Sequence, residues 1–355
     1  MIWRKVCMPE TVLKRYSEVR LEIFRIVIKN MNKNNKLKYS FVSLCAAVMV
    51  SVAGTAWAQV AFVLNSAEDT VSLIDTKTYK EISRNRVGRE PHHLMATPDD
   101  KSLIVANVQS NDLVFFDPLT GAQQKRVDKI SDAYQLGYSP DRKWFVAASL
   151  ALDRVDIYSA ADLKLVKRLP TPRGPSHIAF SADNRHVFVT LQNTNNIAII
   201  DYIDQKVVAT LPVGKQPAGI WVTPDDKHVL VGVMGADFVA VVDWRKRAVT
   251  QKIRTAPGAH NFLPMGDKRR LLISNRVSNS ISIIDMTTLS VLETFKVPGG
   301  PDCMELTADG KELWVTSRWI QKVTVMDMET KKIKIQIPVG RSPHGIYIHA
   351  HAPRQ

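Results

Sequence analysis

Beyond residue 58, short apolar runs alternate with short polar turns, and this pattern recurs with a constant period. In one unit, residues alternate in polarity over Ser176–Ser181, and apolar runs follow at His186–Leu191, Ile197–Asp201 and Val207–Val213. Asp, Asn, Gly or Pro residues separate these runs, as in successive β-hairpins. Because no helical periodicity of useful length interrupts them, the pattern predicts an all-β protein.

Three sets of residues recur every 42 positions. The first set closes an apolar strand and is Asp at six of seven positions, the second is an Asp in a turn, and the third is Pro at five of seven positions. The first set is Asp75, Asp117, Ser159, Asp201, Asp243, Asp285 and Asp327, and the third is Pro91, Ala133, Pro175, Pro217, Ala259, Pro301 and Pro343. The constant spacing shows that the chain is built from seven repeats.

Four antiparallel strands in each of seven 42-residue repeats predict a seven-bladed β-propeller. The repeat region begins with the second strand of a unit, at Val60–Asn65, and ends with a first strand, at His344–His349. We therefore expect the N- and C-terminal strands to share one blade, because this pairing removes the open edge of the ring.

The N-terminal segment carries the pattern of an export signal. Met31–Lys38 is basic, Tyr39–Val52 is apolar, and Ala56–Ala58 has small residues at its first and third positions. This combination predicts a signal peptide over residues 31–58 that is cleaved after Ala58, with export to a bacterial periplasm. The apolar run is short for a membrane span. Residues 1–30 are interpreted either as an extension that results from a wrongly assigned upstream start codon or as a long natural n-region of the signal peptide. Residues 59–355 are interpreted as the propeller.

The charge and the cysteine content limit which partners and which cross-links the protein can have. The formal net charge is +14, and half of it falls in the first 58 residues. The remaining excess of Lys and Arg fits either solubility or an anionic partner. Cys303 is the one cysteine that follows the predicted signal peptide. An internal disulfide is therefore excluded from the predicted mature chain, and we expect a buried, inert thiol in a strand.

Several short motifs resemble the YVTN-type β-propeller repeat. They are Phe62–Asn65, Val213–Gly219, Ile283–Asp285, Asp309–Lys311 and Val339–Gly345. The whole chain is similar in layout to the small periplasmic YVTN proteins of Gram-negative bacteria, some of which bind nucleic acid. A more distant resemblance links the fold to the propeller that holds d1-type haem in nitrite reductases. The resemblance implies the fold more strongly than a function, because such propellers serve as binding platforms, cofactor holders and enzymes.

The two positions that follow the proline set carry the candidate chemistry. Five of the nine histidines fall there, where seven first strands should begin around the channel at one face. Arg or Lys residues precede the proline set, and a second loop on the same face adds two arginines and a tryptophan. The candidate ligand-binding residues are His92, His93, His177, His260, His344, Arg89, Arg173, Lys215, Arg276, Arg318, Trp319 and Arg341.

These residues predict a basic, histidine-rich funnel. Arginines give paired donors to an anion, and Trp319 or Tyr134 gives a stacking surface, so phosphate, a carboxylate-bearing tetrapyrrole or single-stranded nucleic acid are candidate ligands. Alternatively, the histidines only satisfy backbone groups at the strand starts. Two to four histidines could meet across the channel as metal ligands. No metal ligand set is assigned, because apart from His349 and His351 no pair has a spacing such as His-x-x-x-His that would bring two ligands together locally. The repeated Asp residues are interpreted as turn caps rather than as calcium ligands or catalytic acids.

The leading functional expectation is a monomeric, non-catalytic periplasmic binding or scaffold protein for an anionic ligand or an unknown protein partner. One alternative is a redox-associated protein that holds a tetrapyrrole or a metal, with His92, His177, His260 or His344 as a ligand. Another is a lactonase-like hydrolase, for which we find no distinctive acid–base pair. The sequence contains no Cys-x-x-Cys-His, Gly-x-Ser-x-Gly, Walker or dinucleotide-binding motif.

Overall fold

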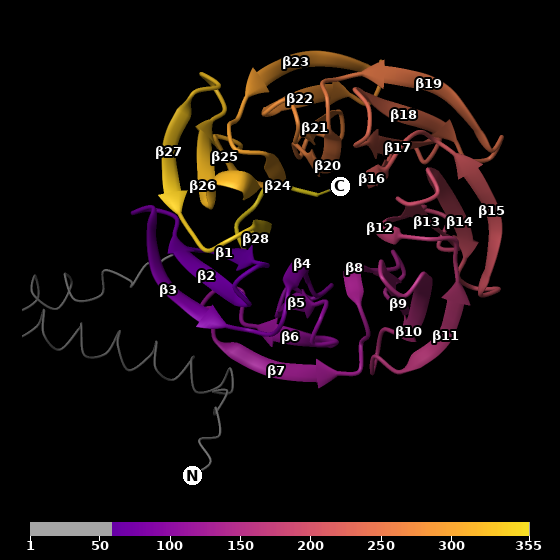
Figure 1. Cartoon of the computed structure of the whole chain (residues 1–355), viewed down its shortest axis with the longest axis horizontal. Helices are drawn as coiled ribbons and strands as arrows, with labels where there is room; N and C mark the ends of the chain where they lie inside the picture. The colour runs from indigo at the N-terminus through magenta and orange to yellow at the C-terminus, as the bar shows by residue number, and fades with distance from the viewer. Residues whose placement is uncertain (1–58, 355) are drawn as a thin grey trace, which may run out of the picture. The chain divides into compact units, whose positions relative to one another are not determined.

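Seven four-stranded antiparallel sheets surround a central axis (Figure 1). The computed structural model describes residues 59–354. Its sheets confirm the predicted seven-bladed, all-β propeller. The predicted upstream extension, signal peptide and cleavage site after Ala58 lie outside the described residues. Within residues 59–354, no helix has the length and apolar character that crossing a membrane requires.

The strands occupy four positions from the axis outward. The innermost are β4 (Pro91–Ala96), β8 (Ala133–Tyr138), β12 (Pro175–Phe180), β16 (Pro217–Val222), β20 (Ala259–Pro264), β24 (Pro301–Leu306) and β28 (Pro343–Ile348). The second are β1 (Val60–Asn65), β5 (Leu103–Asn107), β9 (Trp144–Ser149), β13 (His186–Leu191), β17 (His228–Val233), β21 (Arg270–Asn275) and β25 (Glu312–Ser317). The third are β2 (Thr70–Asp75), β6 (Asp112–Phe116), β10 (Arg154–Ser159), β14 (Asn196–Asp201), β18 (Phe238–Asp243), β22 (Ser280–Asp285) and β26 (Lys322–Asp327). The outermost are β3 (Lys80–Arg86), β7 (Gln123–Asp128), β11 (Leu165–Pro170), β15 (Lys206–Pro212), β19 (Ala248–Arg254), β23 (Ser290–Lys296) and β27 (Ile333–Pro338), and a single 3₁₀ turn, η1, covers Arg318–Ile320.

The apolar core is divided into clusters, each of which lies between two neighbouring blades. In one cluster, Phe188 and Ile199 of one blade pack with Val231 and Trp244 of the next. The second and third strands are largely buried, whereas outermost strands such as β7 are largely exposed. Because burial of apolar surface drives this packing, each blade is stabilised chiefly by its two neighbours.

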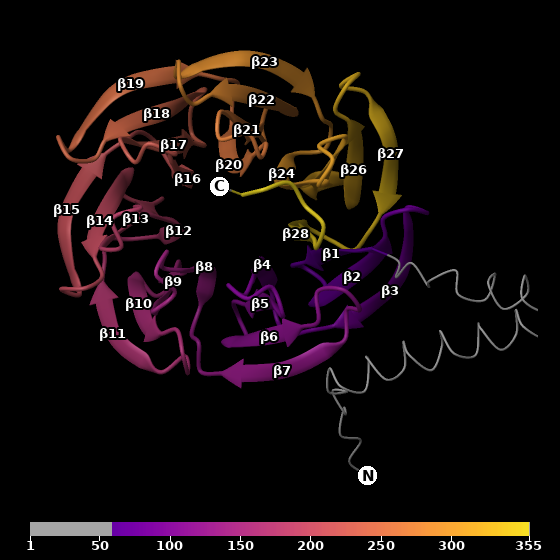
Figure 2. The ribbon, with the colours of Figure 1, turned by 180° about the vertical axis from the view of Figure 1, so that it is seen from behind.

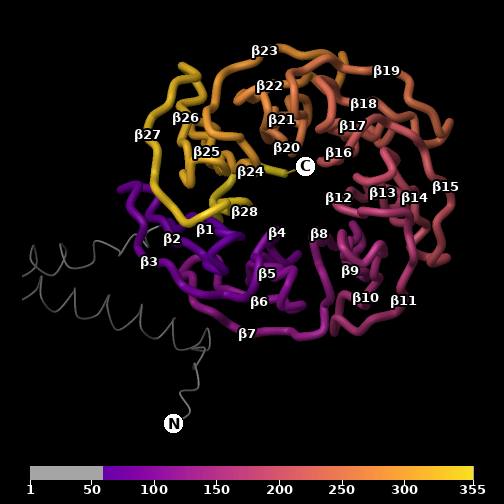
Figure 3. The backbone as a smooth tube through the Cα atoms, in the orientation of Figure 1, coloured from indigo at the N-terminus to yellow at the C-terminus, as the bar shows by residue number. Residues whose placement is uncertain are grey.

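Pairing of the C-terminal strand with the N-terminal strand closes the ring, as the sequence predicted. β28 runs antiparallel to β1, with Val63 opposite Ile346 and Phe62 opposite Tyr347. The tube in Figure 3 shows these two strands completing the first blade, and Figure 2 shows the same closure from behind. Tyr347 is buried and its ring meets Phe62 edge to face at 6.4 Å between centroids.

The repeated aspartates cap turns, which confirms their structural interpretation. Asp75 Oδ1 accepts hydrogen bonds from the backbone N–H groups of Lys77 and Thr78, both at 2.8 Å. The same arrangement recurs at four further positions of the set. These are Asp117, Asp201, Asp285 and Asp327. An aspartate is therefore favoured at these positions because it satisfies turn N–H groups that no strand partner reaches.

Deleting residues 343–354 should abolish cooperative folding, because it opens the ring and exposes the edge of β1. We expect thermal unfolding followed by circular dichroism to lose its single sharp transition. A shorter deletion of residues 349–354 keeps the β28–β1 pairing and should retain that transition. A protein that lacks β28 yet melts as sharply as the intact ring would contradict the closure argument.

Candidate functional site

A bulge at the start of each inner strand turns consecutive side chains toward the axis. On β4, Pro91 pairs with Asn107, but the next pair is Leu94 with Val105, so β4 carries one extra residue. β8, β12, β16, β20, β24 and β28 show a similar shift near the same position. A bulge re-aims side chains that would otherwise alternate between faces. His92 and His93 therefore stack, with ring centroids 5.0 Å apart and planes 3° from parallel.

Hydroxyl groups on neighbouring second strands fix three of these bulges. Each hydroxyl accepts the N–H of the second residue after the Pro or Ala position, which the shifted register leaves without its ladder partner. The bonds are His177 N–H to Thr190 Oγ1 at 3.0 Å, Asn261 N–H to Ser274 Oγ at 3.1 Å and Cys303 N–H to Thr316 Oγ1 at 3.0 Å. These three backbone N–H groups therefore have hydrogen-bond partners although they are excluded from the strand ladder.

The five predicted histidines meet in one buried cluster on the axis. His92 and His344 come closest, with their Nδ1 atoms 3.0 Å apart and their ring planes at 88°. His93 meets His177 at 5.3 Å between ring centroids, and His177 meets His260 at 5.5 Å. All five are at most 7% exposed. The expected funnel wall is therefore a packed aromatic layer below the surface, because the bulges direct these rings inward rather than toward solvent.

Asp302 is the charged centre of this layer. Its carboxylate is fully buried and lies 2.7 Å from Arg276 Nη2 and 3.2 Å from Arg318 Nη1. His260 Nδ1 lies 3.1 Å from Asp302 Oδ1, and Asn261 Nδ2 donates to the same oxygen at 3.2 Å. Burial alone would raise the pKa of Asp302, but the surrounding charged and donor groups outweigh it and hold the pKa well below its usual value. Asp302 is therefore ionised.

The histidines carry no charge at neutral pH. Burial lowers the pKa of His92 to about 3 and that of His260 to about 4. Burial also lowers the pKa values of His93, His177 and His344 well below 6.5. The positive charge of the site therefore comes from Arg276 and Arg318 rather than from the imidazoles.

The geometry fixes the tautomer of His260. Its Nδ1 faces Asp302, and its Nε2 lies 2.8 Å from Arg276 Nη2, which is a donor only. A neutral His260 therefore donates from Nδ1 and accepts at Nε2. His344 places Nδ1 2.8 Å from the carbonyl oxygen of His92, so this nitrogen carries the proton.

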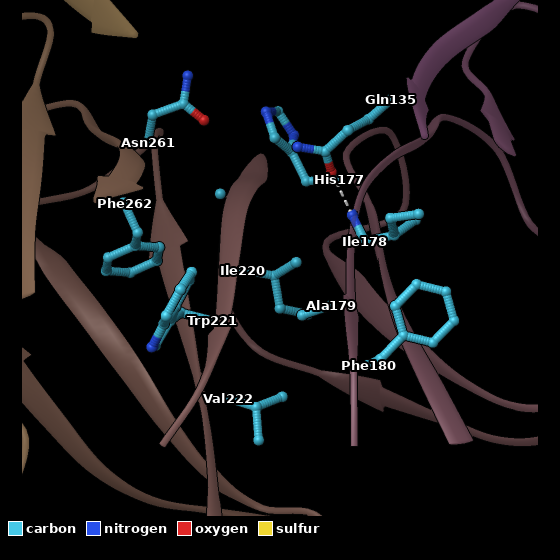
Figure 4. A pocket seen from close by; sticks show the side chains of 11 residues that line it. Gln135, His177, Ile178, Ala179, Phe180, Ile220, Trp221, Val222, Asn261 and Phe262 are labelled. Atoms are coloured by element: carbon cyan, nitrogen blue, oxygen red, sulfur yellow. Dashed lines mark hydrogen bonds between the residues drawn. The ribbon is translucent and has the colours of Figure 1, made fainter. Parts of the chain in front are cut away.

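Farther along the inner strands, beyond the histidines, one side of the channel is mainly apolar. Figure 4 shows Gln135, His177 and Asn261 at one end of a cavity and Trp221 and Phe180 farther along it. The cavity measures about 310 Å³. The Gln135 side chain accepts the backbone N–H of Ile178 and so ties two neighbouring inner strands together.

The other end of the channel is crossed by the residues that follow β28. Ala352 N–H donates to Leu306 O at 2.8 Å, and Arg354 forms an ion pair with the buried Glu305 carboxylate. Burial raises the pKa of Glu305 to about 7 even beside this guanidinium. A second cavity, of about 200 Å³, has both His93 and Arg354 in its wall.

The remaining predicted residues lie around the cluster rather than in it. Arg276 and Arg318 extend over Asp302, with side chains 17% and 26% exposed. Trp319 follows on η1 and is 55% exposed. Four predicted cations are exposed on turns that precede the inner strands. These are Arg89, Arg173, Lys215 and Arg341. Their role as ligand-binding residues stays a prediction.

Sequence reasoning did not single out Asp302, although it is the one acidic residue among the seven that follow the proline set. An acidic residue at a repeat position that holds His92, His260 and His344 in other blades could have identified Asp302 as a candidate site residue. Cys303 is half-buried, and burial raises the pKa of its thiol well above 9, as an inert thiol requires. Asn261 was not identifiable, because its contact with Asp302 depends on the bulge.

Comparisons with known proteins give the family and the fold. The family described as "YNCE-like beta-propeller" matches residues 38–354. No curated protein sequence matches the chain. Among solved structures, a functionally unknown protein from Desulfotomaculum acetoxidans DSM 771 is 15% identical, with a TM-score of 0.71, covering 83% of this chain and 100% of that one.

Two further solved structures share the fold at similar distance. The dihydro-heme d1 dehydrogenase NirN in complex with DHE has a TM-score of 0.61 at 15% identity, covering 82% of this chain and 76% of that one. The Cps50 (Swd1) β-propeller domain of Myceliophteria thermophila has a TM-score of 0.61 at 14% identity, covering 72% of this chain and 89% of that one. At these identities the likeness shows the propeller fold alone.

Replacing Asp302 by Asn should destabilise the protein by about 3 kcal/mol, because it leaves two partly buried guanidinium groups without a counter-charge. The measurement is urea-induced unfolding at neutral pH. Asp285→Asn is the matched control, since Asp285 is also buried but pairs with Arg269, whose side chain is 61% exposed. There we expect less than about 1 kcal/mol. Equal effects at the two positions would argue against a special role for Asp302.

Acidification should weaken the fold below about pH 6.5, where the unfolded chain binds protons that the five buried histidines exclude. The folded pKa values lie below the unfolded value, so stability is present above that pH and falls as pH decreases. Each histidine contributes up to about 1.4 kcal/mol per pH unit in this window, opposed by the raised pKa values of Glu305 and Asp132. Urea unfolding at several pH values should show a shallower slope in His177→Gln. A stability independent of pH between 5 and 7 would contradict this.

Proposed function

We propose that this chain, which belongs to the YNCE-like β-propeller family, is an exported, non-catalytic binding protein that takes an anionic ligand on the face where the inner strands begin. The observation that carries the proposal is the excess of arginine over carboxylate at the axis. Arg276 and Arg318 share Asp302 as their common counter-charge. One positive charge therefore remains uncompensated within this group.

Arg276 also has donor capacity left over. Its Nη2 serves Asp302 and His260, whereas its Nε is buried with no hydrogen-bond partner in the protein. An unmet buried donor is costly, and an anion that enters beside the partly exposed Arg276 side chain would satisfy it. Arginine is suited to this role because its planar fork binds phosphate or carboxylate through two parallel hydrogen bonds.

Exposed groups around the axis extend the same surface. Arg173 and Lys215 lie on turns of neighbouring blades. Trp319 presents an exposed ring next to Gly300. Arg341 contributes less, because it lies 3.5 Å from Glu68. Cationic groups and an exposed aromatic ring on one face suit an extended anion that carries flat rings.

Single-stranded nucleic acid has both features and is the ligand class we favour. A tetrapyrrole with carboxylate groups shares them, and NirN, a propeller similar in fold, is described in complex with DHE. Export is part of the proposal and rests on the predicted signal peptide over residues 31–58.

Binding rather than turnover fits the chemistry of the cluster. A general base works best when its pKa is near the working pH. The pKa of His92 is lowered to about 3 and that of His260 to about 4, while Asp302 is held in ion pairs. These groups are poor candidates for the acid–base pair that a lactonase-like hydrolase would need.

The test is titration of a fluorescently labelled single-stranded DNA oligonucleotide at several salt concentrations. We expect affinity to fall steeply with salt, and Arg173→Gln with Lys215→Gln to lower the slope of log K against log salt by about 1 to 2. Trp319→Ala should cost about 1–3 kcal/mol if its ring stacks on a base.

Lys246→Gln is the matched control, because Lys246 is highly exposed but lies in a turn at the opposite end of its blade. Its affinity and salt slope should equal those of the unmodified protein. Binding that does not respond to salt, or an equal loss in the Lys246 variant, would sink the proposal for this face.

A further inference from the structure

Below the proposed anion surface, the axis carries a second kind of chemistry. We propose that His92, His93 and His344 bind one late first-row transition-metal ion, copper or zinc. This proposal concerns the neutral imidazoles inside the ring and does not depend on anion binding outside it.

The first argument is convergence. One ring nitrogen from each of these three histidines lies within 4.8 Å of the other two. Two of the residues are neighbours on β4, and the third comes from β28 of the adjoining blade. An imidazole-bound ion sits about 2 Å from each nitrogen, which brings three nitrogens to within roughly 3.5 Å of one another. The rings would therefore have to rotate before the three nitrogens could share one ion.

The second argument is unmet hydrogen-bonding capacity. His93 Nε2 and His344 Nε2 are buried and have no hydrogen-bond partner in the protein. Buried polar atoms in folded proteins nearly always have a partner, and leaving one without a partner costs about 1–3 kcal/mol. A lone pair that faces no donor is the form in which imidazole binds a metal ion.

The third argument is the orientation of His344. Its Nδ1 donates to the carbonyl oxygen of His92 at 2.8 Å. Metal-binding histidines commonly donate their second nitrogen to a backbone carbonyl, which fixes the ring and leaves the other lone pair available. His344 therefore has this outer partner, while its Nε2 lies 3.5 Å from Asp302 Oδ2 and makes no hydrogen bond in the protein.

The donor set selects the class of ion. Three imidazoles suit copper, zinc or nickel, whereas calcium and magnesium require oxygen ligands. The nearby carboxylate of Asp302 is already engaged by Arg276 and Arg318. Cys303 Sγ lies 3.7 Å from His344 Nδ1 and forms a second possible triad with Asp302 and His344. Nitrogen with adjacent sulfur favours copper or zinc over harder ions.

The charge of the surroundings ranks the two candidates. Asp302, Arg276 and Arg318 together carry one net positive charge next to the three histidines. Repulsion in a poorly solvated interior grows with the charge of the incoming ion. This positive charge repels monovalent Cu(I) less than it repels Zn²⁺. We therefore expect Cu(I) to bind more tightly than Zn²⁺.

The channel gives the ion a route that avoids Arg276 and Arg318. The cavity of about 200 Å³ has His93, Cys303, Glu305 and Arg354 in its wall. It therefore reaches the histidines from the end of the ring that the C-terminal residues cross. The rings themselves leave little space, since the centroids of His92 and His344 are 3.7 Å apart. That spacing suits an ion better than a flat macrocycle.

The experiment is metal titration of the purified full propeller, with Cu(I) under anaerobic conditions against a competing copper chelator and with Zn²⁺ against a chromogenic zinc chelator. We expect one equivalent of either ion to bind, Cu(I) more tightly, and Mg²⁺ and Ca²⁺ not to compete. Loss of an outer hydrogen-bond partner costs about 10–100-fold in metal affinity, so His93→Gln should cost more than about 100-fold.

Two controls separate this site from others. His186→Gln removes a histidine whose Nδ1 lies 2.6 Å from Asp183 in a distant turn, and should leave metal binding unchanged. The Arg173 and Lys215 variants should also keep their metal affinity, while His93→Gln should keep its affinity for the oligonucleotide. Failure of one proposal is thereby distinguishable from failure of the other.

A spectrum of the unmodified protein tests the site even if the variants do not fold. Long-range ¹H–¹⁵N correlation resolves the ring nitrogens of the nine histidines. One equivalent of metal should shift the nitrogens of His92, His93 and His344 the most. Absence of stoichiometric binding of both ions, or binding that leaves these three unshifted, would overturn the proposal.

Discussion

The antiparallel pairing of β28 with β1 is the constraint on which the rest of the structure depends. Each apolar cluster lies between two blades, so a blade without a neighbour on one side would expose part of its core. Closure supplies that neighbour and brings the seven inner strands to a common axis. Residues that are 42 positions apart in the chain thereby become neighbours in space, which no local structure could achieve.

That convergence places polar groups where a folded protein usually has apolar ones. Asp302 is tolerated there because Arg276, Arg318, His260 and Asn261 all reach its carboxylate. The imidazoles are tolerated because they stay neutral and pack against one another as flat rings. These hydrogen bonds are incomplete, since Nε2 of His93, His177 and His344 and Nε of Arg276 and Arg354 remain without hydrogen-bond partners. Incomplete satisfaction of this kind is often kept for a ligand.

The fold was predictable because its signals are local and repeated. The aspartate and proline sets mark the same turn and strand start in each repeat, and each follows from backbone chemistry that does not depend on distant residues. The location of the five histidines at the axis followed from the same spacing. Their depth did not, because it depends on the bulge between Pro91 and Leu94 and its equivalents. The contact between Asn261 and Asp302 joins two blades and needed the three-dimensional arrangement. The periodic Thr190, Ser274 and Thr316 hydroxyls were a readable sign of the bulges.

Because of the bulges, the residues that stabilise the fold differ from the residues that line the axis. Stability comes from the faces between blades, whereas the character of the axis is set by two adjacent positions on each inner strand. At one such position Gly219 has no room for a side chain, since an added Cβ would meet the carbonyl oxygen of His260. At another, His93 fills the equivalent place. Mutation at these few positions could thus change what the ring recognises while the blades remain as they are, so relatives with the same architecture need not share a ligand.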